Sequence, residues 1–435
     1  MRGWSPERIA DAAGARLVEP GTRRDGPTRA VIDSRHAHRG DLFVGLPGER
    51  VDGGRFAEDV IGAGAWGVLV GEAWAGIDNA DEGVVLVAPD PLLALQRLAT
   101  EWRRELGAQV IGVTGSTGKT STKDLLAAMV DQQRRVIATP QNLNTEIGLP
   151  LTVLGAPAGT EVLVLEMAMR GAGQIAELAE IAEPDVGVIV NIGPVHLELL
   201  GSIEAIAAAK AELLAALRPG GTAVIPANEP LLDPHRRDDV TTVTFGPGGD
   251  VSELPDALDL DVGGGRLSAH MHRNALAALA AARAVGVQPT GYLQVAVTEL
   301  RGERLDLPGG IVVVNDCYNA NPMSMRAALD DLAASAPETG RRIAVLGDML
   351  ELGSQEERFH QEIGAHARAT GVDLLVTVGP RAAAMGPAFG GAVEHVADAA
   401  AAAELLPSLL QAGDTVLVKG SRGVGLEVVA QRLTR

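Results

Sequence analysis

Short apolar runs recur along the chain, and most are separated by segments in which apolar residues return at every third or fourth position. These runs are rich in Val, Ile and Leu. The runs that predict buried strands lie at 109–113, 162–165, 186–190, 223–225, 311–314, 343–346, 374–378 and 416–418. Buried strands that alternate with amphipathic helices are typical of parallel sheets covered by helices. The chain is therefore expected to be an α/β protein.

The N-terminal region differs from the rest of the chain. Residues 28–88 contain short strands and many glycines, and residues 90–106 predict a connecting helix that opens with Pro91. A chain of 435 residues is also too long for one ordinary core. We predict three domains, which are a small α/β N-terminal domain at 1–88, a central doubly wound domain at 89–302 and a C-terminal Rossmann-like domain at 303–435.

Composition narrows the partners that this chain can have. Its net charge is −19 and no run of Lys or Arg offsets that acidity, so we expect no nucleic-acid partner. One cysteine, Cys317, rules out an intramolecular disulfide. The N-terminus has no apolar signal core, and no apolar run approaches the roughly 18 residues that a membrane helix needs. A cytoplasmic enzyme without membrane insertion is the natural expectation.

A glycine-rich turn follows the strand at 109–113 and leads into a predicted helix. Backbone amides at a helix N-terminus bind phosphates, Lys119 can reach the β- and γ-phosphates, and the Thr120 hydroxyl can bind Mg²⁺. The general P-loop pattern is missed, because Val113 stands where its first glycine belongs. A chance glycine-rich turn is the alternative. The predicted phosphate-binding residues are Gly115, Ser116, Thr117, Gly118, Lys119 and Thr120.

Two polar residues follow buried strands and should reach the same sheet edge as this turn. Glu166 comes directly after 162–165, and His196 comes a few residues after 186–190. Open α/β sheets bind ligands at the carboxyl ends of their strands, so Glu166 is a candidate Mg²⁺ ligand beside Thr120. His196 is a candidate ligand for a second ion. A solvated carboxylate and a structural loop histidine are the alternatives.

Lys210 lies on the apolar stripe of a predicted helix. The stripe follows 3-4-3-4 spacing and consists of Ile203, Ile206, Lys210, Leu213 and Leu217. Burial disfavours the ammonium form, so it lowers the pKa and yields a neutral amine that can react with CO₂ to form a carbamate. The carbamate would be an oxygen ligand for Mg²⁺. The alternative is a lysine whose stem packs on the stripe while its head reaches solvent.

Several of these segments resemble the Mur ligase family, the ATP-dependent amide-forming enzymes of peptidoglycan assembly, and its folylpolyglutamate synthase relatives. They are T-G-x-T-G-K-T at 114–120, E-x-[GA]-x at 166–169 and A-x-K-x-E-[LI] at 208–213. The resemblance implies that Lys119, Glu166, His196 and Lys210 are catalytic. It further implies two Mg²⁺ ions, one held by Thr120 and Glu166 and the other by His196 and carbamylated Lys210.

Further residues resemble the family's ATP-binding positions. Asn274 lies within 270–278, which resembles the helix H-x-x-x-N-A-x-A-A and implies a contact with adenine. Arg301 and Asp316 resemble an arginine and an aspartate at the entry to the C-terminal domain. Arg304 is a rival for the arginine, and exposed helix-end charge is the alternative for both arginines.

Within the family, the C-terminal segments 315–322, 345–353 and 418–423 resemble those of the members that add D-alanyl-D-alanine to UDP-N-acetylmuramoyl-tripeptide. The D-N-P-R segment of the diaminopimelate-adding members is absent. Segments 33–35 and 40–53 resemble the N-terminal domain found in both the tripeptide- and the dipeptide-adding members. At position 145 this chain has Thr, where a residue with an amide side chain is common in the family. The resemblance implies these substrate-binding residues: Ser34, Arg35, Asn142, Asn144, Tyr318, Asn319 and Asn321.

The expected activity is therefore an ATP-dependent ligation through an acyl phosphate. A folylpolyglutamate-type ligase is one alternative, although that group lacks the 33–35 region. A non-catalytic nucleotide-binding homologue is another, although Thr120, Glu166, His196 and Lys210 are all present. A monomer is expected. The sequence leaves open the third residue of the tripeptide and the choice between dipeptide and depsipeptide.

Overall fold

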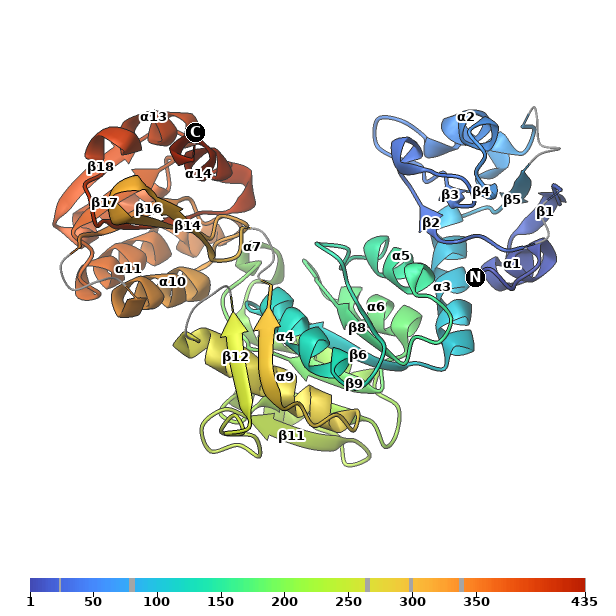
Figure 1. Cartoon of the computed structure of the whole chain (residues 1–435), viewed down its shortest axis with the longest axis horizontal. Coiled ribbons are helices and arrows are strands. Elements are labelled where there is room, and N and C mark those ends of the chain that lie inside the picture. Colours follow the sequence, from blue (N-terminus) through green and yellow to red (C-terminus); the bar gives the residue numbers. More distant parts are fainter. Residues whose placement is uncertain (23–24, 78–82, 263–266, 297–299, 336–339, 435) are drawn as a thin grey trace.

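The fold is known from a computed structural model, which forms three lobes with the N-terminal and C-terminal lobes on opposite sides of a central one (Figure 1). Each lobe is built around its own sheet, and each sheet lies within one of the three predicted segments. The α/β class and the three-domain organisation are thereby confirmed, whereas the boundaries at 88 and 302 stay predictions. The structure describes residues 1–22, 25–77, 83–262, 267–296, 300–335 and 340–434.

The N-terminal sheet has the order β1-β5-β4-β3-β2, with β1 antiparallel and the other pairs parallel. Helix α2 packs on β4. Helix α1 begins at the cap Ser5 and ends at Gly14, whose φ of 62° suits glycine. The bounds are α1 Pro6–Ala13, β1 Arg16–Glu19, β2 Ala30–Val31, β3 Leu42–Val44, α2 Ala57–Gly62, β4 Gly67–Val70 and β5 Val84–Val87.

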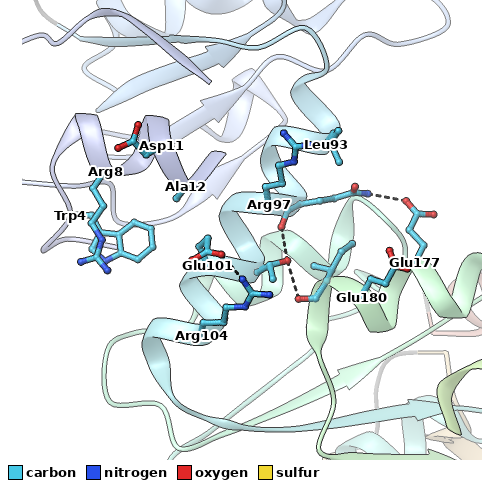
Figure 2. A pocket seen from close by; sticks show the side chains of 13 residues that line it. Trp4, Arg8, Asp11, Ala12, Leu93, Arg97, Glu101, Arg104, Glu177 and Glu180 are labelled. Atoms are coloured by element: carbon cyan, nitrogen blue, oxygen red, sulfur yellow. Dashed lines mark hydrogen bonds and ion pairs between the residues drawn. The ribbon is translucent and has the colours of Figure 1, made fainter. Parts of the chain in front are cut away.

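Helix α3 (Pro91–Leu106) joins the N-terminal and central lobes, as the sequence predicted. The Asp90 carboxylate caps it by accepting from the amides of Leu92 and Leu93, both at 3.0 Å. Gln96 on α3 donates to Glu177 on α6 at 3.0 Å, within a cleft of about 630 Å³ between α1, α3 and α6 (Figure 2). One buried apolar cluster continues from α1 through α3 to α5, α6 and α8, so the two lobes share a core.

The central sheet is entirely parallel, with the order β11-β10-β9-β6-β8-β7. Helices α4 and α9 share one apolar cluster with it, and α5, α6 and α8 share another. Strands β12 and β13 form a separate parallel pair. The bounds are β6 Gln109–Thr114, α4 Lys119–Asp131, β7 Val136–Ala138, α5 Gly148–Gly155, β8 Val162–Glu166, α6 Gln174–Ala182, β9 Val186–Ile189, α7 Leu197–Leu200, α8 Ile203–Ala215, β10 Thr222–Pro226, β11 Thr241–Phe245, β12 Leu258–Val262, α9 Ala269–Ala284 and β13 Gly291–Val295.

The C-terminal sheet has the order β14-β15-β19-β16-β17-β18, in which only β14 is antiparallel. The bounds are β14 Glu303–Leu307, β15 Ile311–Asn315, α10 Pro322–Ser335, β16 Arg342–Gly347, α11 Glu356–Ala369, β17 Leu374–Val378, α12 Met385–Phe389, β18 Ala392–Val396, α13 Ala399–Leu409, β19 Thr415–Lys419 and α14 Glu427–Leu433. All eight strands predicted from apolar runs are present. Among the described helices, none combines the length and apolar character that crossing a membrane requires.

Candidate active site

The predicted phosphate-binding turn connects β6 to α4 at the carboxyl edge of the central sheet. Gly118, with a φ of 73°, immediately precedes α4, and a Cβ on it would lie 2.6 Å from the Asn274 side-chain oxygen. Only glycine suits both that backbone and that contact. The half-buried Lys119 ammonium donates to the Gly115 carbonyl at 2.8 Å. The turn thus presents helix-terminal amides and a cation, as a phosphate site requires.

Asn191 holds the turn through hydrogen bonds, and the sequence analysis did not predict this residue. Its side-chain oxygen accepts from the Thr117 amide at 2.9 Å, and its amide group donates to the Thr117 hydroxyl at 3.0 Å. The Ser116 hydroxyl accepts from the Gly193 amide at 2.9 Å. Asn191 lies just beyond β9, beside β6, and this strand-end position was the signal that could have identified it.

Glu166 is the last residue of β8 and is 1% exposed. Pairing of β8 with β6 sets it opposite Val113, just before the phosphate-binding turn. One carboxylate oxygen accepts from the Asn144 amide group at 2.8 Å, whereas the other is buried without a partner. A buried carboxylate oxygen without a hydrogen bond is costly unless a cation binds it. The environment therefore fits a Mg²⁺ ligand rather than a solvated strand-end charge.

Lys210 is 2% exposed on α8, and its ammonium has no hydrogen-bond or ion-pair partner among the described residues. Burial lowers its pKa well below the ordinary value of 10.5, and the nearby charge of Lys119 lowers it further. The alternative of a head group in solvent is therefore wrong, and the predicted shielding from water is confirmed. A lowered pKa favours the neutral amine, which is the nucleophile that carbamate formation needs.

His196 has a left-handed backbone, with a φ of 54°, and precedes α7. Its Nδ1 forms a hydrogen bond with the Glu351 carboxylate from the C-terminal lobe. The pKa of His196 is lowered from its ordinary value, because burial outweighs the raising effect of the Glu351 carboxylate and the charge of Lys119 lowers it further. His196 does not lie at the start of the Lys210 helix, because α7 ends at Leu200 and α8 starts separately at Ile203.

These donors fit Mg²⁺ once phosphate oxygens are added. Thr120 is 5% exposed in the first turn of α4, and Glu166 has the unpartnered oxygen. Within the described parts of the chain, no three His, Cys, Asp or Glu side chains form a ready-made metal site. Mg²⁺ in phosphoryl-transfer enzymes is commonly held by one or two protein ligands and by substrate phosphates. The residues present match that kind of site.

A cleft of about 340 Å³ lies between the central and C-terminal lobes and contains most of the predicted nucleotide-binding residues. Its walls come from the phosphate-binding turn, α9 and the residues after β15. The predicted residues that line it are Ser116, Thr117, Gly118, Lys119, Thr120, Asn274, Arg301, Asp316, Asn319 and Asn321. Two segments far apart in the chain thus meet around one polar cavity.

The C-terminal wall of this cleft is rich in cations. The Lys419 ammonium is 2% exposed and donates to the Asp316 carboxylate at 2.6 Å and to the Asn319 carbonyl at 3.0 Å. The Arg301 guanidinium lies 4.0 Å from the centre of the Tyr318 ring, and its Nε is buried without a partner. Arg304 is exposed and pairs with Asp306, also on β14. Between the two rival arginines, the geometry favours Arg301 as the ATP contact.

Three predicted substrate residues lie elsewhere. Ser34 and Arg35 form part of a short 3₁₀ turn in the N-terminal lobe, and Arg35 is 83% exposed and paired with Asp33 at 2.6 Å. That pairing holds the pKa of Asp33 below its ordinary value. Asn142 is exposed in the loop before α5, which packs against β2. The structure therefore does not gather these residues with the nucleotide cleft.

The fold and the site together define an α/β nucleotide-binding enzyme of the phosphoryl-transfer class, with a P-loop domain facing a second doubly wound domain. The family model "Mur ligase middle domain" matches residues 113–282, and the model "Mur ligase, glutamate ligase domain" matches residues 300–422. The chain belongs to the Mur ligase family.

Named relatives resemble the chain along almost its full length. The UDP-N-acetylmuramoyl-tripeptide--D-alanyl-D-alanine ligase of Bacillus subtilis is 38% identical, covering 98% of this chain and 97% of that protein. The crystal structure of MurF from Acinetobacter baumannii has a TM-score of 0.85 at 29% identity, covering 99% of each chain. MurF ligase from Thermotoga maritima in complex with ADP has a TM-score of 0.79 at 29% identity, covering 93% of this chain and 96% of that one.

Proposed function

We propose that this chain is the ATP-dependent ligase that joins D-alanyl-D-alanine to the terminal carboxylate of UDP-N-acetylmuramoyl-tripeptide. This reaction is the last peptide-adding step of peptidoglycan precursor synthesis, and we assign it to the cytoplasm and to a monomer. The observation that carries the proposal is the polar cleft, which is lined by Lys119 of the P-loop, by Arg301 at the domain boundary and by Asp316 of the C-terminal lobe. The names and coverage of the relatives support the choice of substrates.

The chemistry requires activation, because a carboxylate has no leaving group at neutral pH. The tripeptide carboxylate oxygen attacks the γ-phosphorus of ATP, and ADP departs. The dipeptide amine then attacks the acyl-phosphate carbon, the carbon–oxygen bond to phosphate breaks, and the amine loses a proton. Charge develops on the phosphoryl oxygens, so the amides of the turn and Lys119 stabilise the transition state. Arg301 would hold the nucleotide from the opposite wall.

Two Mg²⁺ ions are part of the proposal. Thr120 and Glu166 would hold one ion, and His196 and carbamylated Lys210 would hold the other. Such ions would neutralise charge on the phosphoryl oxygens during the transfer. Asn144 would keep Glu166 oriented through its 2.8 Å hydrogen bond. This role is additional to the substrate contact predicted for Asn144.

Each domain would have a separate task. The N-terminal domain (1–88) would bind the UDP end of the nucleotide through Ser34 and Arg35, and the central domain (89–302) would bind ATP. The C-terminal domain (303–435) would bind the dipeptide through Tyr318, Asn319 and Asn321. The remaining substrate contact, Asn142, lies in the exposed loop before α5.

A substrate panel tests the assignment. Phosphate release from ATP is measured with UDP-muramoyl di- and tripeptides, each combined with D-alanyl-D-alanine, diaminopimelate, lysine or glutamate. We expect release only with a tripeptide and D-alanyl-D-alanine. Addition of one amino acid to the dipeptide nucleotide, or turnover with a folate and glutamate, would overturn it. Tripeptides ending in diaminopimelate or lysine, and D-alanyl-D-lactate, decide the points that the sequence leaves open.

The carbamate is tested by labelling. The chain has only four lysines, so a ¹³C carbamate signal formed from labelled bicarbonate is readily assigned by substitution. We expect a signal in the wild type that is absent from Lys210→Ala. Lys210→Ala should fold but turn over slowly, and formate or acetate should restore part of the rate, whereas Lys210→Arg should not recover. A signal that persists in Lys210→Ala would remove Lys210 from the proposal.

A further inference from the structure

Glu351 reaches from the C-terminal lobe to both metal-binding loops of the central lobe. It follows β16, and its carboxylate accepts the hydrogen bond from His196 Nδ1 in the loop after β9. Its other oxygen lies 3.9 Å from Arg170 Nε, in the loop that starts with Glu166. The His196 and Glu351 side chains are 23% and 37% exposed, so this contact is partly shielded from solvent. One carboxylate therefore touches the loops that carry two proposed metal ligands.

The backbone around this contact is unusual on both sides. Five described residues other than glycine have a positive φ, and His196 (54°) and Glu351 (63°) are two of them. The Glu198 amide also donates to the Glu351 carbonyl at 3.4 Å. Left-handed backbone costs a non-glycine residue about 1–2 kcal/mol and persists where the surroundings fix it, often at functional sites. Because two such residues meet across a domain boundary, we infer that their backbones are held in this conformation to keep the two side chains in contact.

A hydrogen bond to one ring nitrogen of a histidine decides which nitrogen can bind a metal. With its proton on Nδ1 and donated to Glu351, His196 has its lone pair on Nε2. A carboxylate that holds a metal-binding histidine in this way fixes its tautomer and ring orientation, and its loss typically weakens metal binding by about 10- to 100-fold. The contact to Glu351 thus prepares His196 for a cation on the opposite side of the ring.

We propose that Glu351 is the positioning residue for His196, so that the second metal site is complete only when the C-terminal domain is docked on the central domain. This inference rests on the proposed function, because the cation is the second Mg²⁺ of the ligase reaction. The hydrogen bond between Glu351 and His196 would thus couple docking of the C-terminal domain to binding of the second ion. Another interdomain pair, His270 with Asp331 at 2.8 Å, includes no proposed metal ligand and serves as a comparison.

Binding of Mn²⁺, measured by electron paramagnetic resonance with a non-hydrolysable ATP analogue, tests the coupling without relying on turnover. The wild type should bind two ions. Glu351→Ala should keep one with unchanged affinity and bind the second about 10- to 100-fold more weakly. Glu351→Gln, whose amide oxygen still accepts from Nδ1, should lie between them. Glu362→Gln removes a carboxylate that pairs with Arg326 at 2.7 Å elsewhere in the same domain, and it is the matched control, which should bind two ions normally.

A double variant separates positioning from a merely structural contact. If Glu351 acts through His196, the combined Glu351→Ala and His196→Ala variant should bind the second ion no more weakly than His196→Ala alone. Additive losses would overturn the positioning role. Two normally bound ions in Glu351→Ala would overturn it while leaving the proposed function intact. Fewer than two ions in the wild type would overturn both this inference and the proposed two-metal site.

Discussion

At the scale of single residues, the chain uses its few lysines in one place. It has only four, and Lys119, Lys123, Lys210 and Lys419 are all half-buried or buried in or next to the phosphate and metal loops. Lys123 donates to the Thr139 carbonyl at 2.8 Å, and the Thr139 hydroxyl accepts from the Glu166 amide at 2.9 Å. In a chain with a net charge of −19, the Lys119 ammonium in the phosphate-binding turn supplies local positive potential that an anionic nucleotide needs.

Replacement of Lys119 by alanine should nearly abolish the ligation. In the proposed mechanism the Lys119 ammonium stabilises charge on the phosphates, so its loss should cost several kcal/mol of transition-state stabilisation, or roughly 10³-fold in kcat. Phosphate release with saturating substrates measures the loss. Unchanged thermal unfolding would show that the fold is intact. Near-normal turnover by Lys119→Ala would remove the P-loop lysine from the mechanism.

The buried Lys210 should make stability depend on pH. Its pKa is lowered by burial, so the unfolded chain binds a proton that the folded chain lacks over the range between the lowered pKa and 10.5. The free energy of unfolding therefore rises with pH across that range. The stability gained in this way is lost again as pH falls from 10.5 through the lowered pKa of the folded state. In CO₂-free buffer, the wild type should gain stability relative to Lys210→Met as pH rises from neutral toward 10.5. A constant difference would show that Lys210 is protonated in the fold.

At the scale of elements, the sequence predicts helices and strands from their local apolar periodicity, but it does not predict contacts that depend on which strands are neighbours. The apolar runs predicted eight strands, and the 3-4-3-4 stripe predicted the buried face of α8 correctly, including Lys210. Asn191 and Glu351 were missed because their partners lie about 74 and 155 residues away along the chain. Which strands are neighbours, and hence which strand ends meet, depends on sheet order, and no local period contains that information.

Two glycines on either side of β6 offer a comparison, since Gly118 precedes α4 and Gly107 follows α3. Gly118→Ala adds backbone strain at a φ of 73° and a Cβ 2.6 Å from the Asn274 oxygen, so ADP affinity should fall at least about 10-fold. Gly107→Ala adds similar strain at a φ of 61°, with no atom within 4 Å of the new Cβ. It should lower the unfolding temperature by a few degrees and leave ADP affinity unchanged. Equal ADP affinity in both variants, by calorimetry, would show that the close contact with Asn274 is unimportant.

At the scale of the whole molecule, function depends on lobes that the sequence cannot place relative to one another. The C-terminal lobe contributes Asp316 and Lys419, and the domain boundary contributes Arg301, to a cleft that is also lined by the P-loop of the central lobe. The N-terminal lobe stands on the opposite side of the central lobe (Figure 1) and contacts it through α1, α3 and α5. Composition and periodicity predicted three domains. The nucleotide cleft forms where the central and C-terminal domains meet, and their relative position could not be predicted.

Arginine substitutions test whether the C-terminal lobe takes part in ATP binding. Arg301→Ala should raise the KM for ATP by about 10- to 100-fold, because a charged hydrogen bond across the cleft contributes about 1.5–3 kcal/mol. Arg304→Ala removes an exposed charge of the same type three residues away and should change KM by less than about twofold. Steady-state kinetics at saturating dipeptide measures both. The reverse ranking would assign the ATP contact to Arg304.

The most direct test of the ligase assignment follows the oxygen atoms. UDP-N-acetylmuramoyl-tripeptide labelled with ¹⁸O in its terminal carboxylate is incubated with the protein, ATP, Mg²⁺ and D-alanyl-D-alanine, and the products are analysed by mass spectrometry. If the carboxylate is activated as an acyl phosphate, one labelled oxygen should appear in the released phosphate, and the other should remain in the new amide of the pentapeptide product. Unlabelled phosphate, or ATP hydrolysis without pentapeptide, would contradict the proposed reaction.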